Sequence, residues 1–260
     1  MDYGGRPSIN MEIKATNFIV ELGDVLGDRL ILRNGEARHL TGVMRGGKGD
    51  LFYAVDGQGK RYCSLITVVQ REEVYADIVS ITRNENEPLM EITLGIPMLK
   101  GSAMDYALEK ATECGVDGFV PYTSANTMIP ASDDESFDRK RRRWNNLIRS
   151  AVKQSLRSRI PKIEDVSSFS ELLKTSDKYP RKIIADSGSG GNSLFDFKFP
   201  DSDAQILLLV GPESGFTAEE LDDAVNAGFS RIRFGSRRLR AETAAAIFPM
   251  ILQYATGELT

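Results

Sequence analysis

The pattern of hydrophobic and turn residues changes abruptly near Pro88, and this change constrains the fold more than any other feature. Before it, short runs rich in β-branched and aromatic residues alternate with turn signals such as Gly46–Asp50 and Asp56–Gly59. After it, short apolar runs alternate with longer segments of helical periodicity. The first pattern predicts a small β-barrel or another β-rich domain. The second predicts an open parallel sheet whose ligand site lies beyond the carboxyl ends of its strands.

We therefore predict an α/β protein of two domains, residues 1–86 and 87–260, joined by the polar stretch Arg83–Pro88. Strands are expected in the first domain at 18–22, 30–32, 50–55, 62–69 and 74–81. Strands are expected in the second domain at 91–96, 118–122, 183–185, 206–210 and 232–234. Helices are expected from Ser102 to about Cys114, from about Phe137 to Arg157, from Thr217 to about Ala227 and over 242–254.

The histidine and cysteine content excludes several classes of enzyme. The 260 residues include one histidine, His39, and two cysteines, Cys63 and Cys114. A Ser-His-Asp triad, a Cys-His pair or a multi-histidine metal site cannot be built from this set within one chain, so no metal is expected. Met1–Asn10 lacks the apolar core of a signal peptide, and no apolar run approaches the ~20 residues of a membrane span. These observations predict a soluble cytoplasmic protein with no membrane partner.

The positive charges are concentrated in two places, although the net charge is −4. Nine basic residues and no acid lie between Arg139 and Arg159, and five arginines and no acid lie between Arg231 and Arg240. The predicted helix over 137–157 has one apolar face and an opposite face of basic residues. An ordinary solvated face is the alternative, but a stripe of one sign repels itself, so we favour contact with phosphates. The charged residues expected to make this contact are Arg142, Arg149, Lys153 and Arg157.

Two of the expected strands lead into glycine-containing loops, Gly211–Thr217 and Phe234–Arg240. Glycine lets a backbone approach a ligand closely, and the helix that follows the first loop offers unsatisfied N–H groups. Neither loop carries a dinucleotide fingerprint or a phosphate-binding P-loop, which disfavours a nicotinamide dehydrogenase. Plain loop geometry is at least an equally weighted alternative for one such turn alone, but two such loops after two strands predict one shared pocket.

The loop residues Leu209-Val-Gly-Pro-Glu-Ser-Gly-Phe-Thr217 and Phe234-Gly-Ser-Arg-Arg-Leu-Arg-Ala-Glu-Thr-Ala244 resemble a motif pair of one family. This family is the ribosomal RNA small subunit methyltransferase E family, within the SPOUT class of knotted methyltransferases. The resemblance extends to His39–Arg45, to Lys100–Val116 and to the Gln154–Pro161 segment. It therefore covers the whole chain.

The resemblance implies methylation of N3 of a uridine in 16S rRNA near the decoding site, with S-adenosylmethionine (SAM) as the methyl donor. It also implies a trefoil-knotted C-terminal domain, a PUA-like N-terminal β domain, and a homodimer with active sites at the subunit interface. The rRNA partner is either free 16S rRNA or an assembled small subunit, and we expect the assembled particle to be preferred. By the family pattern, the donor site comprises Leu209, Val210, Gly211, Pro212, Glu213, Gly215, Phe234, Gly235, Leu239 and Arg240, and Ile184–Asp186 lies beneath it.

Uracil N3 carries a proton at neutral pH, so the reaction needs a base or strong polarisation of the ring. We assign Glu242 as the base and Arg240 as the stabiliser of negative charge on the uracil oxygens. A purely structural role for Glu242, in the first turn of the last helix, is an equally weighted alternative. Arg38, His39, Arg45 and Arg237 are expected to contact RNA, although a structural role is an open alternative for the lone histidine.

This chain departs from the family pattern at Ser214, where glycine is usual, and at Lys153, where glutamate is common. A positive φ at position 214 would strain a serine by about 1 kcal/mol. Two other functions stay open: a SPOUT methyltransferase acting on a ribose 2′-hydroxyl or on tRNA, and a non-catalytic RNA-binding protein that kept the fold. Measured binding of SAM separates the second from an enzyme.

Overall fold

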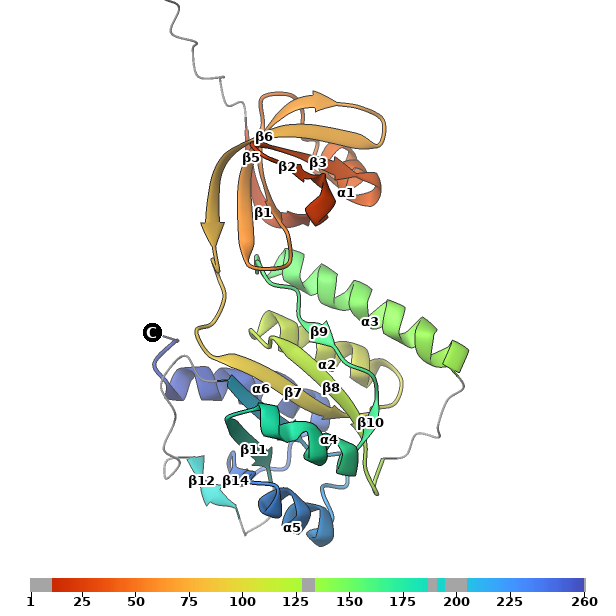
Figure 1. The fold of residues 1–260 in the computed structure, drawn as a ribbon, viewed down its shortest axis with the longest axis vertical. Helices are drawn as coiled ribbons and strands as arrows, with labels where there is room; N and C mark the ends of the chain where they lie inside the picture. The colour runs from red at the N-terminus through yellow and green to blue at the C-terminus, as the bar shows by residue number, and fades with distance from the viewer. Residues whose placement is uncertain (1–10, 128–133, 187–190, 195–204, 260) are drawn as a thin grey trace, which may run out of the picture. The chain divides into compact units, whose positions relative to one another are not determined.

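The computed structural model describes residues 11–127, 134–186, 191–194 and 205–259, and Met1–Asn10 lies outside these ranges. The chain forms two compact units (Figure 1). The first contains residues up to Glu87 and, in addition, Val152–Ile160. The second contains Pro88–Ala151 and the residues from Pro161 onward. A single boundary at 86/87 is therefore wrong for Val152–Ile160, which follow the second unit's first elements in sequence but pack with the first unit.

The first unit is a six-stranded, mostly antiparallel sheet in the order β1-β4-β5-β6-β3-β2, with only β1 and β4 parallel. Its core contains Phe18, Leu40, Phe52 and Ile66, each no more than 1% exposed. The elements are β1 (Glu12–Ile19), β2 (Val25–Leu26), β3 (Arg29–Arg33), α1 (Asn34–Arg38), β4 (Leu51–Val55), β5 (Lys60–Val69) and β6 (Glu73–Arg83). Four of the five expected strands are therefore confirmed with shifted ends, whereas the strand expected at 18–22 shares only Phe18 and Ile19 with β1.

The Val152–Ile160 segment is attached to the first unit by apolar packing and by a buried ion pair. Val152 packs with Ile19, Val55 and Ile160. The guanidinium of Arg157 donates to Oε2 of Glu87 at 2.7 Å, and the two side chains are only 2% and 1% exposed. The other oxygen of Glu87 accepts from the backbone N–H groups of Ser158 and Arg159 at 2.6 and 2.8 Å. Both carboxylate oxygens of Glu87 therefore have hydrogen-bond partners inside the fold.

The second unit is an eight-stranded sheet in the order β10-β8-β7-β13-β11-β14-β12, with β9 beside β8 and every described pairing parallel. The expected parallel sheet is confirmed. The strands are β7 (Glu91–Pro97), β8 (Gly118–Thr123), β9 (Lys162–Ile163), β10 (Ser167–Ser168), β11 (Arg181–Ala185), β12 (Asn192–Ser193), β13 (Gln205–Val210) and β14 (Ser230–Arg233). The helices are α2 (Ser102–Glu113), α3 (Asp134–Gln154), α4 (Phe169–Thr175), α5 (Ala218–Asn226) and α6 (Ala241–Ala255).

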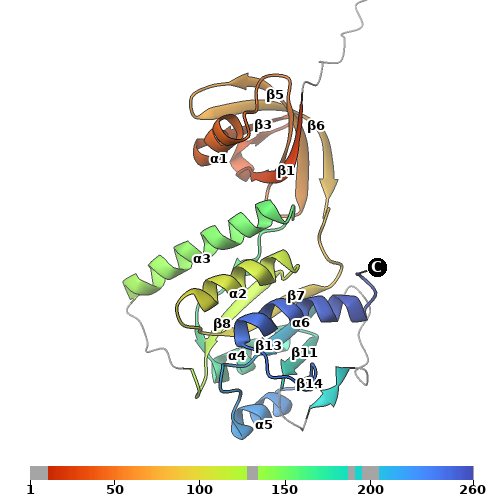
Figure 2. The same ribbon diagram turned by 180° about the vertical axis from the view of Figure 1, so that it is seen from behind.

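Helices cover both faces of this sheet. Helices α4 and α5 lie on the face turned to the viewer in Figure 1, and α2 and α6 lie side by side on the opposite face, seen in Figure 2. Central strand β13 consequently has both faces covered, and Ile206, Leu207 and Leu208 are buried. The carboxyl ends of parallel strands share one edge of the sheet, so the loops after β11, β13 and β14 lie close to one another.

Candidate functional site

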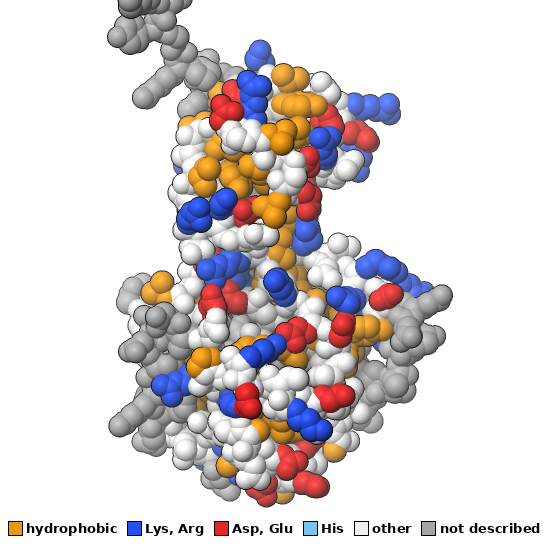
Figure 3. All heavy atoms as spheres, viewed as in Figure 1, with side chains coloured by type: hydrophobic (Ala, Val, Ile, Leu, Met, Phe, Trp, Pro, Cys, Tyr) orange, Lys and Arg blue, Asp and Glu red, His pale blue; other side chains and the backbone are white. Residues whose placement is uncertain are grey.

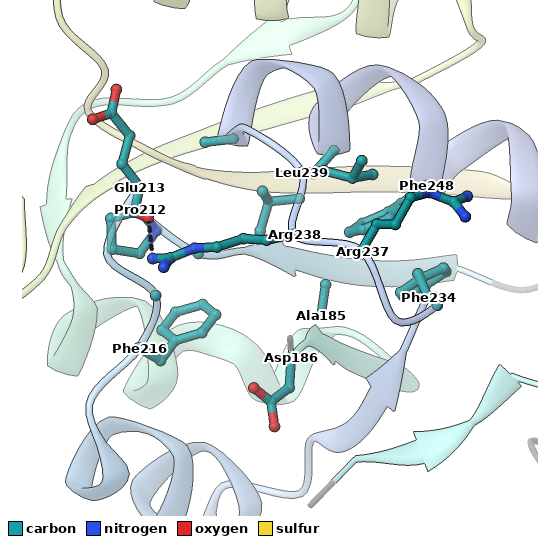
Figure 4. Close-up of a pocket in the computed structure, with 16 residues that line it drawn as sticks. Ala185, Asp186, Pro212, Glu213, Phe216, Phe234, Arg237, Arg238, Leu239 and Phe248 are labelled. Atoms are coloured by element: carbon teal, nitrogen blue, oxygen red, sulfur yellow. Dashed lines mark hydrogen bonds between the residues drawn. The ribbon is translucent and has the colours of Figure 1, made fainter. Parts of the chain in front are cut away.

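A pocket lies at the carboxyl ends of β11, β13 and β14 (Figure 4). The space between its walls, open mouth included, is about 590 Å³. Its walls are the loop after β13, the loop after β14, the end of β11 and one face of α6. Eight residues that the family pattern assigns to a donor site line it: Val210, Gly211, Pro212, Glu213, Gly215, Phe234, Gly235 and Leu239.

The loop after β13 is held at both of its ends. At its start, the hydroxyl of buried Tyr122 donates a 2.6 Å hydrogen bond to the carbonyl oxygen of Val210. Burial raises the pKa of Tyr122 well above its usual value, so the hydroxyl stays a neutral donor. At its end, Thr217 and Glu220 form the capping box that begins α5, as the sequence predicted. A Cβ on Gly211 would lie 2.9 Å from the ring of Phe216, so glycine permits this close packing.

The loop after β14 is joined to the first loop and to α6. Gly235 turns the chain with a φ of 117°, a conformation that other L residues rarely adopt. The guanidinium of Arg238 then donates to the backbone carbonyl of Glu213 at 2.5 Å, as the dashed line in Figure 4 shows. Phe234 stacks on Phe248 of α6 with 4.0 Å between the ring centroids. The two loops therefore line one pocket, as their sequence spacing predicted.

Asp186 brings a carboxylate to the pocket wall from the end of β11 (Figure 4). Its Oδ2 accepts a 2.6 Å hydrogen bond from Nη2 of Arg231, which lies on the neighbouring strand β14. The pair fixes the orientation of the Asp186 side chain, which is only 9% exposed. The sequence located Ile184–Asp186 beneath the pocket, and Ala185 and Asp186 do line it.

Three predicted site residues do not line this pocket. Leu209 is fully buried in the core behind the loop. Arg240 lines a neighbouring opening with Glu213, Arg238 and Leu239, and its side chain is 85% exposed. Glu242 lies in the first turn of α6, with its Oε1 3.9 Å from Nη1 of Arg240. Its Oε2 is buried and has no hydrogen-bond partner among the described residues.

Sequence reasoning missed the contribution of α6 and of Phe216 to the pocket. Ala241, Ala244 and Phe248 line it and recur three and four residues apart, so they form one face of the helix. That spacing was visible in the sequence. It did not reveal a pocket because an apolar helix face is more often packed against a sheet.

The profile of the RNA methyltransferase domain family matches residues 85–253. The ribosomal RNA small subunit methyltransferase E of Mesomycoplasma hyopneumoniae is 32% identical over 170 residues, which is 65% of this chain and 72% of that protein. The protein of the same name from Bacillus subtilis is 26% identical over 227 residues, covering 85% of this chain and 88% of its own length.

Solved structures give the same result. The ribosomal RNA small subunit methyltransferase E of Neisseria gonorrhoeae, bound to SAM, has a TM-score of 0.84 at 27% identity. The match covers 95% of this chain and all of the other. A Legionella pneumophila methyltransferase in complex with SAM has a TM-score of 0.81 at 26% identity, covering 94% and 98% of the two chains.

The chain belongs to the ribosomal RNA small subunit methyltransferase E family. The serine at position 214 of the family's loop motif does not strain the backbone. Gly215 has the left-handed φ of 80°, whereas Ser214 is not among the described residues with positive φ. The backbone strain that a positive φ would impose on a serine at position 214 is therefore absent.

The second departure from the family pattern, Lys153, is also accommodated within the fold. Its ammonium lies 2.8 Å from Oε1 of Glu36, in the first unit, and its side chain is 16% exposed. It therefore adds no unpaired charge to the basic helix face. The expectation that Arg157 contacts RNA is wrong for this structure, because α3 ends at Gln154 and Arg157 is buried against Glu87.

Acids from other elements neutralise part of the remaining basic stripe on α3. Arg141 pairs with Asp165 at 2.7 Å, and Arg143 pairs with Asp105. Arg142 is exposed, and Arg149 is half-buried. Lys and Arg side chains are interspersed with Asp and Glu over the face of the second unit seen in Figure 3. The absence of acids between 139 and 159 in sequence thus overstated the separation of charge in space.

The expected RNA-contacting residues of the first unit differ in their surroundings. Arg38 is exposed and pairs with Glu72 at 2.9 Å. His39 is half-buried with its ring 5.5 Å from that of Phe18, which favours the structural alternative for this histidine. Arg45 is exposed and has a φ of 57°, a strained conformation for a residue other than glycine. Arg237, from the second unit, lines the pocket.

Within the described part of the chain, no group of three or more His, Cys, Asp or Glu side chains is arranged to hold a metal ion. Nor does any helix in the described ranges have the length and hydrophobicity needed to cross a membrane.

Proposed function

We propose that this chain transfers a methyl group from SAM to N3 of one uridine in 16S rRNA, near the decoding site of the small ribosomal subunit. The observation that carries the proposal is the pocket formed by the two glycine-containing loops, together with the family to which the chain belongs. An rRNA substrate means that the reaction would occur in the cytoplasm. We further propose that the loops belong to a trefoil knot and that the first unit is a PUA-like RNA-binding barrel.

The residues of the pocket fit the donor molecule. Phe216, Phe234 and Leu239 offer flat and apolar surface for an adenine ring. Asp186 is a fixed carboxylate that can accept hydrogen bonds from ribose hydroxyls. SAM carries an already activated methyl group, so the chain's own task is to orient the acceptor and to manage the proton on N3.

Glu242 supports the role of base through its unpartnered oxygen. A buried carboxylate oxygen normally has a hydrogen-bond partner, so the state of Oε2 favours a donor supplied from outside the described residues. An N3–H group would be such a donor once RNA binding gives access to Oε2, because Glu242 does not line the pocket in the structure described. The exposed guanidinium of Arg240, next to Glu242, would stabilise the negative charge that develops on the uracil oxygens.

We also propose a homodimer formed by the second unit. Ile247, Met250 and Tyr254 are exposed apolar residues three and four positions apart on α6, and Tyr106 is exposed on the adjacent α2. Exposed apolar residues that cluster on one face are typical of an interface between proteins. The same helix carries Ala244 and Phe248 into the pocket, so a dimer on this face would place a second subunit close to the site.

Incubation with labelled SAM and small subunits that lack the modification tests the function, with nucleosides mapped by mass spectrometry. The expected product is 3-methyluridine at a single position of the decoding region. A methylated ribose, or transfer to tRNA only, would replace this proposal with the other SPOUT activity. Absence of both transfer and SAM binding would favour the non-catalytic RNA-binding protein.

A further inference from the structure

A second pocket adjoins the first and shares Pro212 and Glu213 with it. Its other lining residues are Met98, Leu99 and Lys100, after β7, then Asn126 and Thr127, after β8, and Ser214. We infer that this second pocket binds the target nucleotide of the RNA, with Lys100 on a phosphate or carbonyl oxygen. The inference rests on the proposed methyl transfer, and it names residues of the acceptor site.

The position of the pocket favours an acceptor over another small molecule. It lies at the carboxyl ends of β7, β8 and β13, the same edge of the sheet as the donor pocket. In-line transfer needs the attacking atom and the methyl group within about 3–3.5 Å of each other, so donor and acceptor must occupy adjoining spaces. Pro212 and Glu213 are the wall between two such spaces.

The loop after β8 is fixed by contacts that its own fold does not require. A capping box needs only one oxygen of Glu220, the one that accepts from the N–H of Thr217 at 2.9 Å. The other oxygen accepts from the N–H of Ala125, 95 residues earlier in the chain, at 2.9 Å. The amide of Asn126 donates to the carbonyl of Gly215 at 3.0 Å. These hydrogen bonds therefore hold the loop after β8, which lines the second pocket, against the loop after β13, which lines both pockets.

The chemistry of the lining matches a uracil nucleotide. Uracil presents two carbonyl oxygens on either side of N3, and both accept hydrogen bonds. Lys100, Asn126 and Thr127 supply an ammonium, an amide N–H and a hydroxyl as donors. Lys100 is exposed and makes no ion pair with any described residue, so its charge is available to RNA. Met98 and Leu99 are largely buried and give the pocket an apolar floor for a base.

Lys100 provides the test, because its charge can be removed while its stem is kept. In the Lys100→Met variant, we expect the affinity for unmodified small subunits to fall roughly tenfold, the effect of one charge-assisted hydrogen bond. The slope of log affinity against log salt concentration should fall by about one. The Kd for SAM, measured by calorimetry, should stay within about twofold. The Lys100→Arg variant should restore most of the affinity, and Lys174→Met, at an exposed lysine on α4, is the matched control.

Two results would overturn the inference. If Lys100→Met lost SAM binding and methyl transfer together, the pocket would be assigned to the tail of SAM. Unchanged subunit affinity in Lys100→Met would leave the pocket without a role in the acceptor. Because subunit binding is measured without turnover, a wild-type protein that binds subunits but makes no 3-methyluridine would refute the proposed reaction and still report on Lys100.

Discussion

Glu242 is the residue on which the proposed chemistry depends most. Because its Oε2 is buried and unpartnered among the described residues, replacement by glutamine keeps its volume and removes its ability to take a proton. We expect Glu242→Gln to reduce methyl transfer by at least about a hundredfold, a usual contribution of general-base catalysis. Calorimetry should show an unchanged Kd for SAM. Near-normal turnover would assign Glu242 to the structural role, and Glu219→Gln on α5 controls for loss of a surface carboxylate.

Glu220 offers a second test at the level of one residue. Glutamine has a single acceptor oxygen, so in Glu220→Gln one of the two N–H groups, of Thr217 or Ala125, loses its partner. We expect the free energy of unfolding to fall by about 1–3 kcal/mol, as measured by urea denaturation. Transfer should fall as well, because the loop after β8 is released. Asp222→Asn, on the exposed side of the same helix, should leave both quantities unchanged.

Single residues also show what the sequence could and could not predict about the site. The glycines and Glu213 were predictable because their spacing follows two recognisable strands, and they line the pocket. The burial of Arg157 was not predictable, because its partner Glu87 is 70 residues away in the sequence and the charge of a residue does not show whether it is buried. The absence of backbone strain at Ser214 was not predictable either, since only a structure shows whether φ is positive at position 214 or 215.

At the level of elements, α3 and the segment that follows it have different functions in the fold. Truncation of Arg157 to alanine leaves Glu87 as a buried charge with one partner removed, which costs about 3–5 kcal/mol of stability. Arg142→Ala, at an exposed position of α3, should change stability by less than about 0.5 kcal/mol. Urea denaturation measures the stability of both variants. For Arg142→Ala, the slope of log affinity for small subunits against log salt concentration should also fall by about one if Arg142 contacts a phosphate. Equal stability of both variants would contradict the assigned roles.

The longer elements were predictable and the short ones were not. The helices at 102–113, 218–226 and 241–255 have clear periodicity, caps or stop signals, and they lie within two residues of expectation. Strands β9, β10 and β12 contain two residues each and carry no pattern of their own. Helix α4 was missed although Ser168 and Glu171 form a capping box, because seven residues are too few to show a period. The return of Val152–Ile160 to the first unit depends on tertiary contacts alone.

At the level of the whole molecule, the exposed apolar face of α6 predicts self-association. Replacement of Ile247 by glutamate places a charge within this face and should shift the protein from dimer to monomer in sedimentation experiments. Val225 on α5 is similarly exposed and apolar but lies outside this face, so Val225→Glu is the matched control. A dimer that persists in Ile247→Glu would locate the interface elsewhere.

The pairing of Arg157 with Glu87 also has a consequence for the order in which the protein can be completed. The first unit is encoded first, yet the cation that neutralises its buried carboxylate is synthesised 70 residues later. During translation, β7, α2, β8 and all of α3 are synthesised before that cation. A nascent chain that ends before residue 157 therefore carries an unneutralised Glu87, and the N-terminal unit reaches its final stability only when the C-terminal unit is already partly made.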